Sequence, residues 1–69
     1  MPILPQIYPN PVTNGMLYFG AEVDHFELVD VQGQLVKKGY NAEFLNVEGL
    51  SKGVYILKFD HRSEKIIIP

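Results

Sequence analysis

The chain has 69 residues and no cysteine, which limits it to one small domain without disulfides, thiolate zinc sites or cysteine nucleophiles. Its formal net charge of −2 and its six scattered lysines and arginines argue against a nucleic-acid-binding surface. Hydrophobic residues make up 46% of the chain, with four Tyr and four Phe, so a packed core is feasible. No apolar run approaches the roughly 20 residues that cross a bilayer, so we expect no membrane insertion.

The N-terminal part predicts extended segments separated by proline and glycine turns. Residues 3–8 form an extended segment that suits an edge strand, and Pro9 and Pro11 fix the turn that follows it. The Asn14-Gly15 pair supplies the positive φ angles of a tight turn. This part of the chain therefore predicts an edge strand, a proline turn and the start of a hairpin.

A second hairpin is predicted in the middle of the chain. Gly20 ends or bulges the strand before it. Asp30 opens the turn of this hairpin and Gly33 closes it. We expect Asp30 to accept backbone N–H groups and Gly33 to adopt a left-handed conformation, because these are the ordinary roles of Asp and Gly in tight turns. We favour this structural role for Asp30 over a catalytic one.

The strongest alternating pattern lies near the C-terminus. Tyr55, Leu57 and Phe59 fall on one face of a strand and should point to the core, together with Leu50 before it. Gly53 is expected to satisfy the turn into this strand. The complete set of predicted strands covers residues 3–8, 16–19, 25–31, 34–38, 44–47, 54–60 and 64–68. The fold class is therefore all-β, a small immunoglobulin-like antiparallel β-sandwich of about seven short strands.

No pattern of reactive side chains indicates an enzyme or a cofactor site. His25 and His61 have no second ligand at a metal-binding spacing, and Ser51 and Ser63 lack the context of a catalytic nucleophile. The carboxylates are spread singly over turns and solvent faces. We therefore expect no catalytic residues, no metal and no cofactor.

Four short motifs occur in an order and spacing that resemble a known family. The chain resembles the type A C-terminal sorting domain of the type IX (Por) secretion system, from about residue 7 to residue 68. The individual motifs are common turn and strand chemistry, and the resemblance depends on all four in register. The motif residues are Tyr8, Pro9, Asn10 and Pro11, then Asp30 and Gly33, then Leu50, Gly53 and Tyr55, and finally Lys65, Ile66, Ile67 and Ile68.

The resemblance implies a non-catalytic signal attached to the C-terminus of a cargo protein in Bacteroidota. It implies an outer-membrane translocon and a sortase as partners, with the sortase usually removing the domain. The cargo would pass through the periplasm and end at the cell surface or outside the cell. On this reading residues 1–6 are an extension or linker from the cargo, and residues 7–69 are the sorting domain.

The C-terminal strand is the preferred recognition element, because a β-branched strand near the chain end can pair with a partner sheet. An equally weighted reading is that Ile66 and Ile68 fill the core while Ile67 is partly covered. For the N-terminal motif we expect a local role, with Asn10 bonded to nearby backbone and the Tyr8 ring packed with its hydroxyl at the rim. Exposed edges also predict edge-strand or domain-swapped dimers.

Two other function classes stay open on the sequence. A small surface module that binds carbohydrate or protein would use Tyr18, Tyr40 and Phe44 as an aromatic platform, provided that at least two of them share an exposed face beside polar groups. A purely structural spacer domain is the third reading.

Overall fold

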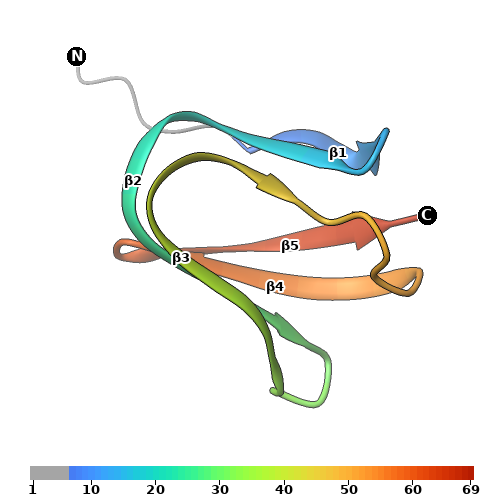
Figure 1. The fold of residues 1–69 in the computed structure, drawn as a ribbon. Coiled ribbons are helices and arrows are strands. Elements are labelled where there is room, and N and C mark those ends of the chain that lie inside the picture. The colour runs from blue at the N-terminus through green and yellow to red at the C-terminus, as the bar shows by residue number, and fades with distance from the viewer. Residues whose placement is uncertain (1–6) are drawn as a thin grey trace.

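The computed structural model describes residues 7–69, which form five antiparallel strands and no helix (Figure 1). The strands are β1 (Tyr8–Thr13), β2 (Met16–Asp30), β3 (Leu35–Asn46), β4 (Gly53–Phe59) and β5 (Arg62–Ile68). The prediction of an all-β antiparallel fold is confirmed. The predicted extended segment over residues 3–8 lies outside the described residues, except for its last two positions.

One long strand, β2, organises the sheet. Along one edge β2 pairs with β3, and along the other it pairs first with β1 and then with β4. The hydrogen-bonded path β1-β2-β4-β5 curls round, so that β1 comes to lie beside β5 at the two ends of the path (Figure 1). The sheet therefore wraps around a single core.

The predicted count of seven strands is wrong, because two pairs of predicted strands are continuous. Residues 16–19 and 25–31 both belong to β2, which bends near Gly20, where φ is 77° and the register with β3 shifts. Residues 34–38 and 44–47 lie mainly in β3, which passes through Asn41 at a φ of 52°. Gly and Asn accept a left-handed conformation at low cost, so the strands bend without ending. The layers expected for an immunoglobulin-like sandwich are parts of one curled sheet.

The N-terminal turns follow the prediction only in part. Asn14 and Gly15 have φ angles of 61° and 70°, which confirms the tight turn between β1 and β2. Pro9 and Pro11, expected in a turn, lie within β1 instead. The reason is that β1 is a short outer strand with irregular pairing to β2, where a missing backbone N–H is tolerated.

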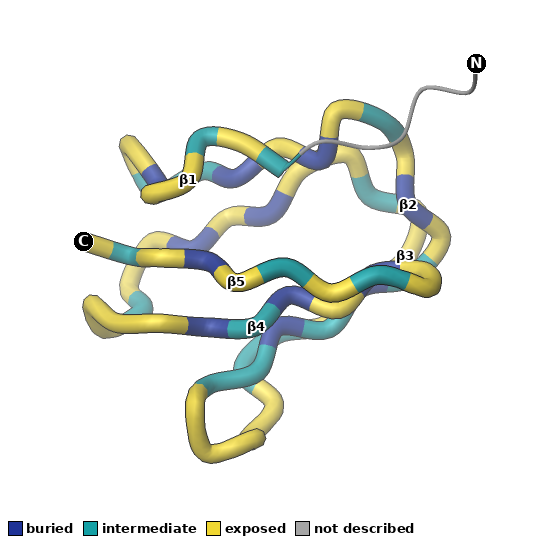
Figure 2. The backbone as a smooth tube through the Cα atoms, turned by 180° about the vertical axis from the view of Figure 1, so that it is seen from behind, coloured by how far each residue is buried: buried dark blue, intermediate teal, exposed yellow. Residues whose placement is uncertain are grey.

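The core fills the inside of the curl. Phe19 is fully buried and lies against Phe26 and Phe59, with ring centroids 5.5 and 5.9 Å away. The predicted inward set on β4 is confirmed: Tyr55, Leu57 and Phe59 are buried, and the residues between them are half-buried or exposed (Figure 2). The buried residues are Val12, Leu17, Phe19, Val23, Phe26, Leu28, Leu45, Val47, Tyr55, Leu57, Phe59 and Ile66.

Candidate recognition site

The C-terminal strand β5 is half core and half surface. It pairs along its length with β4, from Gly53 opposite Ile68 to Phe59 opposite Arg62. Ile66 is fully buried and Ile68 packs against the core, whereas Ile67 is 37% exposed. The predicted inward and outward positions are therefore confirmed.

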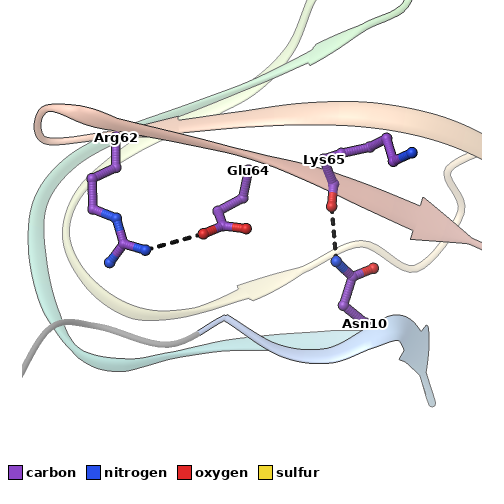
Figure 3. Close-up of polar contacts among 4 residues, drawn as sticks. All are labelled: Asn10, Arg62, Glu64 and Lys65. Carbon is purple, nitrogen blue, oxygen red and sulfur yellow. Dashed lines mark hydrogen bonds and ion pairs between the residues drawn. The ribbon is translucent and has the colours of Figure 1, made fainter.

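The N-terminal motif reaches this strand through one side chain. The Asn10 amide nitrogen donates to the Lys65 carbonyl at 2.8 Å, and the Ile67 N–H donates to the Asn10 amide oxygen at 3.1 Å. Figure 3 shows the Asn10 side chain extending from β1 toward the Lys65 carbonyl on β5. The expectation that Asn10 bonds to nearby backbone is wrong. Its partners lie 55 and 57 residues further along the chain. The turn preference of an asparagine between two prolines does not predict a contact at that separation.

The same strand carries a charged pair at its start. The Arg62 guanidinium lies 3.1 Å from the Glu64 carboxylate (Figure 3). It also lies 5.4 Å from the centre of the Phe59 ring. Both charged side chains are more than one third exposed. A pair with this exposure contributes little to stability, because water and salt screen it.

The second motif forms the turn that the sequence predicts. One carboxylate oxygen of Asp30 accepts the N–H groups of Gln32 and Gln34, each at 2.9 Å, and the Asp30 carbonyl accepts the Gly33 N–H at 3.0 Å. Gly33 has a φ of 84°. The structural roles assigned to Asp30 and Gly33 are confirmed.

The third motif lies at the start of β4. Tyr55 is buried, and its hydroxyl donates to the Ser51 carbonyl at 2.6 Å. Leu50 packs against the core, and Gly53 has a φ of 149°, a conformation that favours glycine. Leu50 also borders a hollow of about 250 Å³ beside Ile68 at the end of β5. This motif therefore lies next to the C-terminal end of the chain.

The geometry brings three of the four motifs to β5, and a comparison with protein families decides what they belong to. The model of the secretion system C-terminal sorting domain matches residues 6–68. The chain belongs to this family. The match confirms the resemblance to type IX sorting domains. No curated protein and no solved structure matches the chain.

Membership in this family makes the sorting domain a C-terminal secretion signal, which implies attachment to a cargo, contact with secretion machinery and export toward the cell surface or medium. Sorting-signal domains are generally non-catalytic. Within residues 7–69, no three His, Asp or Glu side chains come together in a way that could hold a metal ion. That part of the chain also has no helix with the length and hydropathy of a membrane span.

A second surface of the sorting domain carries a row of aromatic rings. Tyr8, Tyr18 and Phe44 are register partners on β1, β2 and β3, and each is at least 40% exposed. The Tyr8 and Tyr18 rings stack with centroids 5.5 Å apart. With Glu43 they border a hollow of about 320 Å³. Tyr40, expected in the same platform, instead lies against His25, with ring centroids 5.1 Å apart.

Sequence reasoning placed Tyr18 and Phe44 in this platform and missed Tyr8. The Tyr8 ring is half exposed and stacked on Tyr18, rather than packed with only its hydroxyl at the rim. Tyr8 joins this row of rings because β1 pairs with the start of β2, which places Tyr8 opposite Tyr18. Because the sequence predicts a proline turn after Tyr8, it does not predict this pairing.

Proposed function

We propose that this domain directs an attached cargo across the outer membrane through the type IX translocon, and that the translocon reads strand β5. The observation that supports the proposal is the convergence of the family motifs on this strand. Asn10 binds the backbone on one side of Ile66, and Tyr55 and Gly53 pair with Ile66 and Ile68 on the other. Three of the four motifs thus form or contact β5, and their contacts hold this strand in a fixed register.

A signal common to unrelated cargoes has to be read from the domain itself. β5 offers alternating side chains for specificity and main-chain groups for affinity, which are the elements of recognition by strand addition. Its outward side chains include Lys65 and Ile67, both exposed. The hairpin turn at Asp30 has a sufficient structural explanation, so we assign it no contact with the translocon.

We further propose that a sortase removes the domain by cutting on its N-terminal side, with residues 1–6 as part of the linker to the cargo. The exported cargo then passes from the periplasm to the surface or the medium of a Bacteroidota cell. In this scheme the domain is a ligand of the translocon and a product of the sortase, and it supplies no catalytic group to either.

The export experiment places residues 1–69 behind a signal peptide and a fluorescent reporter, in a Bacteroidota host with a working type IX system and in a translocon-deficient strain. We expect reporter outside the cell only in the first strain. Retention in the periplasm of both strains would show that the chain is not a sufficient signal. Loss of the domain from the exported reporter, detected by its mass, tests removal by the sortase.

A matched pair of variants tests which strand is read. The β5 variant combines Lys65→Glu with Ile67→Glu, and the control combines Val54→Glu with Lys58→Glu on β4. All four positions are exposed, and each pair introduces the same charge change on neighbouring strands. We expect the β5 variant to lose export and the β4 variant to keep it. Equal export of both variants would refute recognition through β5.

The aromatic row supports a second candidate function, a site for a sugar ring. Aromatic faces stack on the C–H groups of a pyranose, and the Glu43 carboxylate beside the hollow is an acceptor for its hydroxyls. Titration of the isolated domain with a panel of oligosaccharides tests this function, with Phe44→Ala as the non-binding control. Saturable binding that Phe44→Ala removes would support it, and no binding across the panel would refute it for those sugars.

A further inference from the structure

A hollow of about 250 Å³ lies at one end of the sheet, where segments that are distant in the sequence meet. The turn between β1 and β2, the loop between β3 and β4 and the end of β5 lie side by side there (Figure 1). Two of the aliphatic residues at its border are buried and two are half-buried, so it has apolar walls. These residues are Val12, Val47, Leu50 and Ile68.

One carboxylate, that of Glu48, lies at the border of this hollow. The Glu48 side chain occupies the place where a side chain at position 15 would stand. A Cβ at Gly15 would overlap the Glu48 Cγ and lie 3.3 Å from its carboxyl carbon. Gly15 also has a φ of 70°, a conformation that favours glycine. The glycine of the tight turn therefore leaves room for the Glu48 carboxylate beside the hollow.

The loop that carries Glu48 is fixed by its own hydrogen bonds. The Glu48 N–H donates to the Asn46 side-chain oxygen at 2.8 Å, and the Val47 N–H donates to the Gly15 carbonyl at 2.8 Å. The Leu50 N–H donates to the Val47 carbonyl at 3.2 Å. A site whose parts are already in place loses less conformational entropy when a ligand binds.

The Glu48 carboxylate has no partner among residues 7–69, because none of them forms a hydrogen bond or an ion pair with it. The Lys37 ammonium reaches the same loop, but it donates to the Asn46 carbonyl at 2.6 Å. The carboxylate can therefore accept a cation from outside the domain without giving up a contact within the described residues.

The size and the lining of the hollow fit one kind of ligand group. Its volume is below the roughly 300–1,000 Å³ of pockets for drug-sized ligands, so it suits a single side chain. Lysine and arginine place an aliphatic stem against apolar surface and keep their charged head in a polar setting. An apolar side chain would partly desolvate the Glu48 carboxylate without pairing it, and an acidic side chain would be repelled.

We propose that this hollow receives one lysine or arginine side chain of the translocon, with the stem against Leu50 and Ile68 and the cationic head at the Glu48 carboxylate. The proposal rests on the proposed function, because it adds a specificity pocket at the end of the strand that the translocon reads. Leu50 and Ile68 come from two different motifs, and the hollow gives them a joint role in recognition besides their packing against the core.

The test uses residues 1–69 with n-butylammonium and n-propylguanidinium as probes of the two side chains, and n-butanol as the neutral control. Binding is followed by the chemical shifts of the methyl groups that border the hollow. Glu48→Gln removes the charge with almost no change in shape. Glu22→Gln is the matched control, since Glu22 is an exposed glutamate on β2 that does not border the hollow. Circular dichroism verifies that both variants are folded.

We expect both cations to shift these methyl groups, and we expect Glu48→Gln to weaken their binding about threefold, the effect of losing one exposed charge pair. Glu22→Gln should match the parent. Added salt should weaken the binding of the cations and have little effect on n-butanol. Equal binding of the cations to Glu48→Gln and the parent, or binding of n-butanol as tight as that of the cations, would overturn the proposal. Shifts confined to the rings of Tyr8, Tyr18 and Phe44 would overturn it as well, because the cations would then bind the aromatic row.

The export experiment separates this site from the proposed function. Glu48→Gln should export less reporter than Glu22→Gln, and equal export of the two variants would overturn the translocon as the source of the cation. If the parent reporter depends on the translocon while the cations do not bind at the hollow, the sorting role stands and the pocket fails. If the cations bind through Glu48 while the parent shows no translocon dependence, the cation site stands, and the sorting role and the translocon as its partner both fail.

Discussion

Substituting Asp30 by Ala separates the structural role of a motif residue from a role in recognition. The change removes one carboxylate oxygen that accepts two backbone N–H groups, from Gln32 and Gln34. Because water can replace the carboxylate at this exposed turn, the net loss is about 1 kcal/mol for each bond, or about 2 kcal/mol in total. In a domain of this size, that loss lowers the melting temperature by roughly 8–16 °C.

Thermal and urea unfolding followed by circular dichroism measure this loss, and Asp30→Asn is the matched control because it keeps one side-chain oxygen acceptor. A domain with a stability of roughly 5 kcal/mol stays more than about 95% folded after the substitution. We therefore expect reporter export by Asp30→Ala to stay close to that of the parent. A folded Asp30→Ala protein that fails to leave the cell would refute the assignment of Asp30 to the fold alone.

Three further substitutions test the packing around the signal, each by equilibrium unfolding. Tyr55→Phe removes the hydrogen bond to the Ser51 carbonyl and should cost about 1 kcal/mol, with no change in the core. Ile66→Ala empties a fully buried position and should cost about 2–5 kcal/mol, which at the upper end leaves a domain of roughly 5 kcal/mol stability about half unfolded and should lower export in proportion to the unfolded fraction. Gly39→Ala should cost about 1–3 kcal/mol, because the added Cβ would lie 2.5 Å from the Phe26 ring, and a neutral result would mean that this ring shifts freely.

The sequence predicted features that depend on neighbours along the chain. Asp30 and Gly33 act within one turn, and the positive φ angles of Asn14 and Gly15 close a two-residue hairpin, so their residue types were sufficient. The inward face of β4 was equally readable, because Tyr55, Leu57 and Phe59 recur at every second position of the strand. Local chemistry determines these features, and no tertiary contact opposes it.

The features that the sequence did not predict depend on tertiary contacts. Gly20 was expected to end or bulge its strand, and residues 34–38 and 44–47 were expected to be separate strands, but pairing of β2 with β3 on both sides of Gly20 and of Asn41 keeps both strands continuous. Asn10 read as a turn residue, and only the curl of the sheet brings Lys65 and Ile67 within reach of its amide. Glycine and asparagine occur both in turns and at bends within strands. Contacts between distant segments decide which of these two structures forms.

The position of Asn10 links the first motif of the chain to the last one. The alternation of Ile66 and Ile67 between core and surface exists only while β5 is paired with β4, and the Asn10 bonds exist only while β1 lies beside β5. An unfolded chain presents neither feature, because its main-chain groups are bonded to water. If β5 is the signal, a translocon that reads it also tests whether the domain has folded. On that argument Ile66→Ala lowers export in proportion to the unfolded fraction, although the Ile66 side chain touches no solvent.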